Sequence, residues 1–149
     1  MKKFLPLVLV ITFLASCSTS FLRDEMQIND LIQYKEKIDN TENPAEIYII
    51  KADLSSKVIS LENLIVKDII ESTNVDYQFC VVSELQTEKG IIEFYIFSKN
   101  IRRISYLEKG KTKISVKGEF NRFFSTLDNY YTKVEIINSN IKIAPAQEK

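Results

Sequence analysis

The sequence of 149 residues lacks histidine altogether and contains only three glycines and two cysteines. Without histidine, neither a Ser-His-Asp nor a Cys-His catalytic pair can form, and the commonest metal ligand of proteins is missing. The glycines do not cluster, and the patterns GxxxxGK(S/T), GxGxxG and GxSxG are absent, which excludes a glycine-rich phosphate loop. We therefore find no catalytic, metal or cofactor site in the sequence, and we expect a protein that is not an enzyme.

The N-terminus carries the features of a signal peptide. Lys2 and Lys3 are followed by an uncharged, almost entirely apolar run over residues 4–14. A helix of this length rises about 16 Å, which is well short of the roughly 30 Å hydrocarbon core of a bilayer. The run therefore predicts the apolar core of a signal peptide and not a membrane-spanning helix.

A cysteine preceded by small residues follows this run. The tetrapeptide Leu14-Ala15-Ser16-Cys17 resembles the lipobox of bacterial lipoproteins. The resemblance implies cleavage before Cys17, acylation of its thiol and attachment to a membrane of the cell envelope. Two or more acyl chains suffice for stable attachment, where one chain is marginal. Since Ser18 is not the aspartate associated with retention at the inner membrane, we expect the outer membrane or the cell surface.

The chain after the expected cleavage site is long enough for one domain. Its only other cysteine, Cys80, lies in the apolar stretch Phe79-Cys80-Val81-Val82, so no internal disulfide is available once Cys17 is acylated. We expect Cys80 to be a small buried hydrophobic residue and not a reactive thiol.

The start of this chain has helical periodicity. Residues 24–39 predict an acidic amphipathic helix, and the breaker Asn40-Thr41-Glu42-Asn43-Pro44 follows it. After Pro44 we expect β structure, although the apolar stretch 45–52 fits either a helix or a strand. The expected units are the signal peptide (1–16), the lipid anchor, tether and acidic helix (17–43), a β-barrel domain (44–145) and a polar tail (146–149).

Five β-rich segments and one short helix fill the expected barrel domain. Strands are predicted over 57–70, 76–85, 91–98, 112–120 and 132–143, with a short helix over 100–108 that ends at Gly110. This order predicts a mainly β, five-stranded OB-like Greek-key barrel with a helix between its third and fourth strands. Residues 114–120, Ile-Ser-Val-Lys-Gly-Glu-Phe, resemble the V-x-G strand of OB-like domains in secreted or lipid-anchored bacterial proteins, which are similar to anticodon-binding barrels. The alternative is an open antiparallel α+β sheet with the N-terminal helix on one face.

The strict alternation of 91–98 predicts a possible binding face. With Ile92, Phe94 and Ile96 turned toward the core, Tyr95 and Phe97 project from the opposite side of the third strand. In OB barrels the ligand lies across strands two and three, and aromatic side chains there can stack on sugars or bases. The alternative is that the stretch 45–52 or the N-terminal helix covers Tyr95 and Phe97.

Basic residues concentrate between Lys99 and Arg122. The candidates for contact with an anionic ligand are Arg102, Arg103, Lys113 and Lys117, although acidic segments of the same chain could equally neutralise them. Phe123 and Phe124 either form an exposed tip for protein binding or close one end of the barrel.

These features predict a non-catalytic binding or adaptor lipoprotein. The alternatives are a structural or envelope-assembly protein, and a binder of an anionic glycan, headgroup or nucleic acid. The expected partners are membrane lipid through Cys17 and an envelope protein or anionic ligand. Glu88 and Glu93 flank the third strand and would repel a polyanion, so nucleic acid is not the expected ligand.

Overall fold

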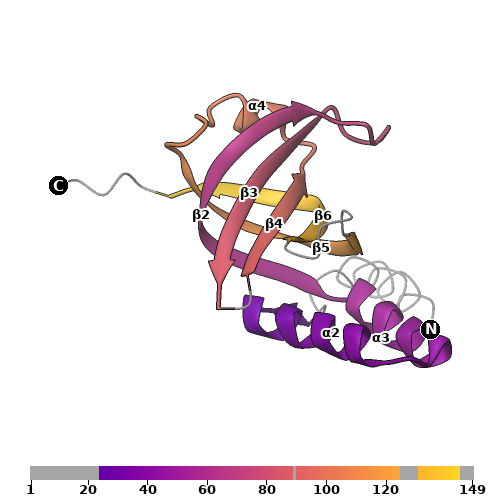
Figure 1. The fold of residues 1–149 in the computed structure, drawn as a ribbon. Helices are drawn as coiled ribbons and strands as arrows, with labels where there is room; N and C mark the ends of the chain where they lie inside the picture. Colours follow the sequence, from indigo (N-terminus) through magenta and orange to yellow (C-terminus); the bar gives the residue numbers. More distant parts are fainter. Residues whose placement is uncertain (1–23, 89, 125–130, 145–149) are drawn as a thin grey trace, which may run out of the picture.

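The computed structural model describes residues 24–88, 90–124 and 131–144, which form a helical hairpin followed by a closed barrel (Figure 1). Cys17, the expected signal peptide and tether, the turn at 125–129 and the tail at 146–149 lie outside the described residues. The elements are β1 (Glu25–Met26), α2 (Ile28–Asn40), α3 (Pro44–Ser55), β2 (Val58–Glu71), β3 (Phe79–Thr87), β4 (Gly90–Phe97), α4 (Ile101–Ile104), β5 (Lys113–Phe124) and β6 (Tyr131–Ile143).

The five long strands close into a barrel in the order β2-β3-β4-β6-β5, with β5 returning to β2. All neighbours are antiparallel except β4 and β6, which run parallel. This mixed barrel, with α4 between its third and fourth strands, has the OB-fold order and confirms the predicted fold class. The open α+β sheet is excluded because the β2–β5 pairing joins the two edges.

The long strand β2 is shared between two neighbours. Its first half pairs with β5, from Val58 to Ile65, and its second half pairs with β3, from Ile65 to Glu71. The β2–β5 register shifts between Leu61 and Leu64, where Asn63 adopts a φ of 58°. Asparagine tolerates this left-handed conformation better than most residues, so it provides the bend that a barrel strand needs.

The segment after Pro44, which fitted either a helix or a strand in the sequence, is the helix α3. Asn43 caps α3, because its side-chain oxygen accepts a hydrogen bond of 3.0 Å from the Ala45 N–H. Pro44 occupies the first turn, where its fixed φ suits a helix and its missing N–H costs nothing. The breaker in the sequence is therefore also a helix start, and the barrel begins only at Val58.

The helix between β4 and β5 is shorter than the predicted 100–108. It ends at Ile104, and the chain then turns so that the Glu108 N–H donates to Thr112 Oγ1 at 2.7 Å. Gly110, with a φ of 74°, donates its N–H to the Val66 carbonyl at 2.7 Å. The first bond closes the loop on itself and the second ties it to β2, in place of further helical turns.

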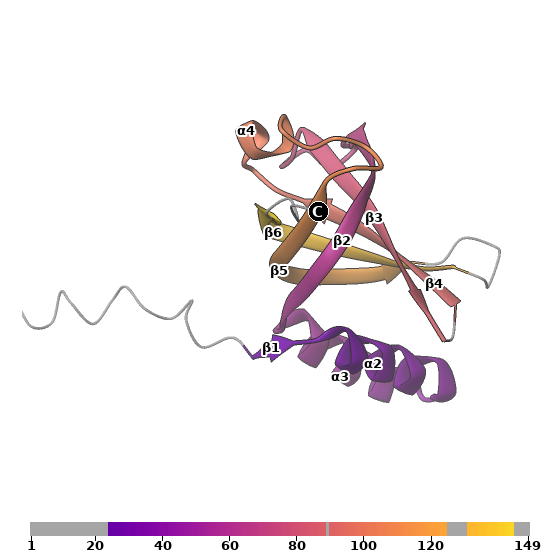
Figure 2. The ribbon, with the colours of Figure 1, turned by 90° about the vertical axis from the view of Figure 1, so that its left-hand side faces the viewer.

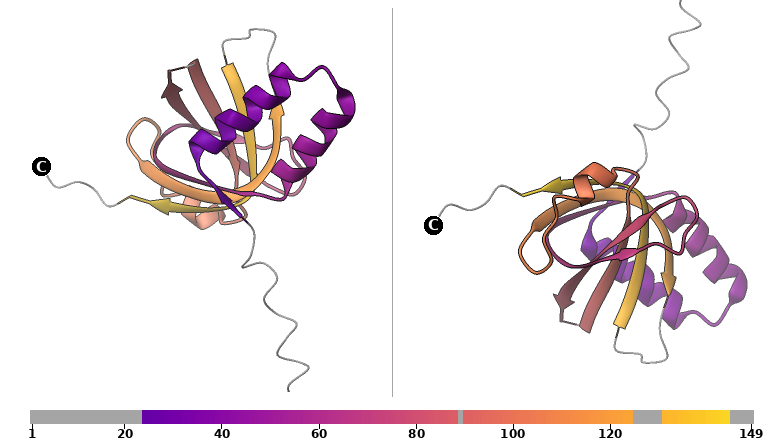
Figure 3. Two further views of the ribbon diagram at one scale, coloured as in Figure 1. Left: turned by 90° about the horizontal axis from the view of Figure 1, so that it is seen from below. Right: turned by 90° about the horizontal axis from the view of Figure 1, so that it is seen from above.

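The core fills the barrel and extends under the helical hairpin. Leu31 of α2, Leu54 of α3 and Met26 of β1 join the barrel core at one end. Figures 2 and 3 show α2 and α3 across this end, whereas α4 lies at the opposite end. The largest fully buried side chains are Phe94, Leu31, Leu54, Ile59, Leu64, Ile96, Ile114 and Ile136.

Gly118 of β5 lies close to the backbone and side chains of β6. A Cβ atom at this position would lie 2.5 Å from Ser139 Oγ, 2.6 Å from Ile136 Cγ2 and 2.9 Å from the Ile137 carbonyl oxygen. The β5–β6 register also shifts between Lys117 and Glu119. The glycine of the V-x-G segment thus permits a close backbone approach that a larger residue would block.

We predict that Gly118→Ala lowers the free energy of unfolding by about 1–3 kcal/mol, because the new methyl group overpacks the β5–β6 contact. Urea denaturation of residues 17–149 measures the change. Adding Ser139→Gly removes the nearest atom and should restore part of the loss, while the Ile137 carbonyl prevents full recovery. An unchanged midpoint for Gly118→Ala would contradict the steric argument.

Candidate functional site

The outer surface of β3, β4 and β6 carries a second apolar cluster, separate from the core. As the alternation of β4 predicted, the barrel core contains Ile92, Phe94 and Ile96. The outer cluster contains Phe97, and Tyr95 packs against it. Cross-strand pairing sets Val82 opposite Tyr95 and Cys80 opposite Phe97. Tyr77 and Cys80 complete this cluster, which lies across strands two and three of the barrel.

A cavity of about 380 Å³ opens on this face. Its floor contains Tyr95, Phe97 and Phe124, and its rim includes the first residues of the β2–β3 connection. In OB barrels this connection and the strand 2–3 face are the usual ligand contacts. The lining residues are Ile70, Glu71, Ser72, Thr73, Asn74, Cys80, Tyr95, Phe97, Arg122, Phe124 and Glu135.

Other aromatic residues, and not the N-terminal helices, cover the predicted aromatic pair. The Phe97 ring lies 5.4 Å from that of Tyr77 and is only 7% exposed. Tyr95 is half-buried and packs edge-on against Phe124 at 5.1 Å. The expected alternative of a cover by 45–52 or α2 is therefore wrong, since both lie at the end of the barrel.

Tyr77 also fixes the β2–β3 connection to β6. Its hydroxyl donates to Asn138 Oδ1 at 2.8 Å and accepts from the Asn138 N–H at 3.1 Å. Asn138 has a φ of 50° and lies beside the β5–β6 irregularity. The tyrosine thus holds the rim of the cavity in place while its ring covers Phe97.

The two phenylalanines near the end of β5 have different surroundings. Phe123 packs against the core and stacks edge-on with Phe120 at 4.9 Å, whereas Phe124 lines the cavity. Both are partly buried. Neither expected role fits the pair as a whole, because consecutive residues of a strand point to opposite faces.

A buried carboxylate forms the polar part of the cavity. The Glu135 side chain is 6% exposed, and its two oxygens accept hydrogen bonds of 2.7 Å from Arg122 Nε and 2.8 Å from Asn121 Nδ2. The Arg122 side chain remains 65% exposed, and its guanidinium carbon lies 5.5 Å from the Phe124 ring centre. A buried carboxylate needs such partners to remain charged.

A chain of ion pairs borders the aromatic cluster on the other side. Lys67 Nζ lies 2.6 Å from Glu84 and 3.2 Å from Glu93, and Lys133 Nζ lies 3.3 Å from Glu93. Tyr95 donates its hydroxyl to Glu93 at 3.1 Å. The hydrogen bonds that Lys67 donates to Glu84 and Glu93 raise the pKa of Lys67 to about 12. Burial alone would raise the pKa of Glu93, but the hydrogen bonds from Lys67, Lys133 and Tyr95 outweigh it and lower this pKa.

Cys80 is 1% exposed, and burial raises the pKa of its thiol to about 12. This confirms the expectation of a buried hydrophobic residue. A protonated, enclosed thiol is a poor nucleophile, so Cys80 contributes shape and not reactivity to the cavity wall.

The predicted basic residues do not join the aromatic pair. Arg102 and Arg103 are exposed on α4, and Lys113 is exposed where β5 begins. Lys117 pairs with Glu25 of β1, as the acidic-segment alternative predicted for such residues. The cation at the cavity is instead Arg122, which reaches it through the β5–β6 register that sequence periodicity does not reveal.

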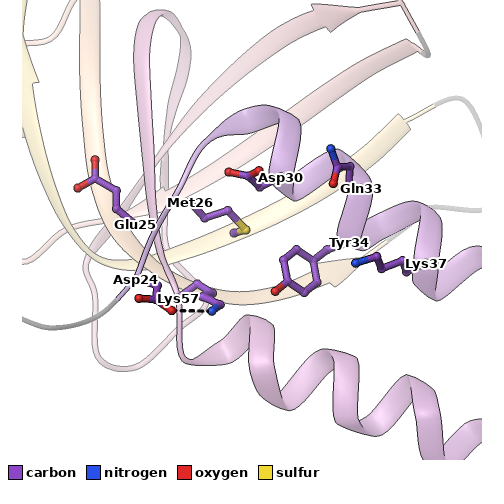
Figure 4. Close-up of a pocket in the computed structure, with 8 residues that line it drawn as sticks. All are labelled: Asp24, Glu25, Met26, Asp30, Gln33, Tyr34, Lys37 and Lys57. Carbon is purple, nitrogen blue, oxygen red and sulfur yellow. Dashed lines mark hydrogen bonds and ion pairs between the residues drawn. The ribbon is translucent and has the colours of Figure 1, made fainter.

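A second, polar pocket of about 290 Å³ lies between α2, β1 and β2 (Figure 4). Lys57 Nζ pairs with Asp24 at 2.9 Å and with Asp53 at 3.4 Å, and Tyr34 donates its hydroxyl to Asp53. The Tyr34 bond lowers the pKa of Asp53 and raises that of Tyr34. These contacts bind the start of the described chain to the helical hairpin.

Within the described residues, no group of three or more histidine, cysteine, aspartate or glutamate side chains is arranged to hold a metal ion. In the same part of the chain, no helix has the length and apolar character needed to cross a membrane.

No protein-family model and no curated protein matches the chain. Among solved structures, it is similar to the mitochondrial single-stranded DNA binding protein Rim1 of S. cerevisiae, with 15% identity and a TM-score of 0.36 over 62% of this chain and 97% of Rim1. It is also similar to the Entamoeba histolytica asparaginyl-tRNA synthetase in complex with asparaginyl-adenylate, with 12% identity and a TM-score of 0.37 over 60% of this chain. The match spans only 22% of the synthetase. TM-scores of this size carry no functional argument.

The ion-pair chain predicts a specific pH dependence of stability. Because the folded-state pKa of Glu93 lies below its ordinary value of 4.5, its ionised form stabilises the fold above that pH and the contribution is lost as the pH falls through the folded-state pKa. The difference in free energy of unfolding between the natural chain and Glu93→Gln should be constant above about pH 5 and shrink in more acidic solution. Urea denaturation across this range measures it.

The exposed Glu46 of α3 provides the control for this experiment. Glu46→Gln should leave the free energy of unfolding nearly unchanged at every pH, because the carboxylate is solvated. A Glu93→Gln difference that grows as the pH falls would contradict the assigned role of the ion pairs.

Proposed function

We propose that the protein is a non-catalytic binding module that takes an uncharged glycan into the cavity on β3, β4, β5 and β6. The observation that carries the proposal is the cavity itself, in which Tyr95 and Phe124 offer aromatic surface beside the Arg122–Glu135 pair. Aromatic rings with a few placed polar groups suit a ligand that has an apolar face and hydroxyl edges.

The charge around the cavity supports an uncharged ligand. Arg122 is already paired with Glu135, and Lys133 is paired with Glu93. Glu71 lines the cavity, and no described cation forms an ion pair with it. Binding to nucleic acid depends on cations that neutralise phosphates, so a net acidic lining disfavours it.

We propose further that Cys17 is acylated and holds the module in the cell envelope, on the outer membrane or the cell surface. The support is the lipobox-like tetrapeptide Leu14-Ala15-Ser16-Cys17 after a short apolar run. The described fold begins at Asp24, which leaves a short segment between the fold and the cysteine.

Binding can be tested with neutral chito-, cello- and malto-oligosaccharides and with a single-stranded oligodeoxynucleotide as the charged comparison. We expect the oligosaccharide that binds to perturb the backbone amide signals of residues 70–74 and 95–97 in NMR titrations. Tyr95→Ala should weaken this binding by about tenfold, since aromatic stacking contributes roughly 1–3 kcal/mol. Tyr106→Ala, which changes an exposed tyrosine near α4, is the matched control.

The opposite pattern would favour the anionic-ligand alternative. The side chains of Arg102, Arg103 and Lys113 are exposed and form no ion pair among the described residues, which is the observation in favour of that alternative. Oligonucleotide binding that falls steeply with salt and is lost in Arg102→Glu/Arg103→Glu, together with an unaffected Tyr95→Ala variant, would contradict the glycan proposal.

Acylation is tested separately in bacterial cells. Radiolabelled palmitate should enter the full-length chain, and Cys17→Ala should abolish the labelling because the thiol that carries the acyl group is gone. Cys80→Ala is the matched control and should leave labelling intact, since Cys80 is buried in the fold. Labelling that persists in Cys17→Ala would refute the assignment.

A further inference from the structure

Helix α3 presents apolar residues on both of its sides. Leu54 on its inner side is fully buried, which accounts for how the helix holds to the barrel. On its outer side, Tyr48 is 75% exposed and Ile49 is 67% exposed. With the exposed Ala45 and Ala52, they form a stripe at the i, i+3, i+4, i+7 spacing, which we call the outer α3 stripe. A helix that is apolar on two sides is expected to be covered on both.

The outer α3 stripe lies close to the point where the described chain begins. Lys57 Nζ contacts Asp24 at 2.9 Å and Asp53, in the last turn of α3, at 3.4 Å. Figure 4 shows Asp24 and Lys57 joined beside α2, at the start of β1. Asp24 is therefore held against the C-terminal end of α3.

The segment from Cys17 to this point is too short to carry the barrel away from a membrane. Residues 17–23 span at most about 24 Å when fully extended. Helix α3, with its 12 residues, is about 18 Å long. A surface that holds Cys17 therefore lies within reach of the whole outer α3 stripe.

We infer that the outer α3 stripe rests on the lipid bilayer, with Tyr48 at the level of the headgroups and Ile49 in the apolar boundary. Tyrosine is enriched at this depth of membranes, and an apolar helix face of this kind binds in the plane of the interface. The inference rests on the proposed acylation of Cys17, which supplies the proximity.

The charges beside the stripe limit the kind of lipid required. Glu42 and Glu46 lie on or before the first turn of α3, and Lys51 lies near its last turn. Because acidic residues outnumber the basic one, attraction to anionic lipid is not the source of binding. We therefore expect docking on zwitterionic phosphatidylcholine with little dependence on salt.

The test attaches the chain to vesicles chemically, so that it does not depend on acylation in cells. Residues 17–149 are coupled through the Cys17 thiol to phosphatidylcholine vesicles that contain a maleimide lipid, while the buried Cys80 does not react. The sequence has no tryptophan, so Tyr48→Trp and the control Tyr106→Trp each introduce one fluorophore. Tyr106 is 60% exposed near α4, at the opposite end of the barrel.

Brominated phosphatidylcholine should quench the emission of Tyr48→Trp at least about twofold more than that of Tyr106→Trp, because only the first residue lies in the interface. Ile49 is exposed, so Ile49→Asp should leave the fold intact, which circular dichroism checks, and adding it should abolish the difference. Equal quenching of the two variants, stronger quenching of Tyr106→Trp, or no quenching would overturn the docking. Concentration-dependent dimerisation that hides Tyr48 without lipid quenching would overturn it in favour of a second copy. Failure of palmitate labelling would instead refute the acylation, independently of these results.

Discussion

The barrel depends on one strand, β2, which forms backbone hydrogen bonds with two neighbouring strands. Because β2 pairs with β5 along its first half and with β3 along its second, it must bend, and Asn63 takes the left-handed conformation that allows the bend. This double pairing removes the free sheet edges and closes the barrel. Closure also sets the parallel pairing of β4 with β6, which brings Glu135 opposite Tyr95. The cavity face therefore follows from how β2 is shared.

A closed barrel of this size buries one side of every strand and must stabilise polar residues on the other. On the outer face, the side chains alternate between aromatic residues and paired charges, as with Tyr95 between Glu93 and Glu135. Lys67, Arg122 and Lys133 beside this face each have a carboxylate partner, so these pairs position the aromatic side chains without leaving three unpaired positive charges there. The cavity face therefore offers a ligand a shaped surface and hydrogen-bonding groups. The exposed cations of α4, in contrast, offer positive charge that is unpaired among the described residues.

Local patterns predicted much of this fold, and non-local pairings account for what they missed. The alternation of 91–98 placed Tyr95 and Phe97 on the outer side, because a strand has a period of two wherever it pairs. Arg122, Phe124 and Glu135 reach the cavity through the β5–β6 register, which contains two shifts that no local pattern reveals. The stretch 45–52 stayed open for another reason. Asn43-Pro44 ends one helix and starts the next, and α3 carries apolar residues on both sides, so its sequence fits a helix and a strand alike.

The two ends of the barrel differ in a way that bears on the orientation of an anchored chain. The helical hairpin and the start of the described chain share one end, whereas α4 lies at the other (Figure 1). The β2–β3 connection that borders the cavity belongs to the α4 end, since Lys99 beside α4 lies 5.8 Å from the Tyr77 ring centre. A barrel held through its N-terminus and resting on α3 would thus keep this rim and the cations of α4 away from the bilayer. Under the two proposals, attachment at the end opposite to the cavity rim would leave the cavity face open to a large ligand, which a free orientation of the barrel at the membrane would not ensure.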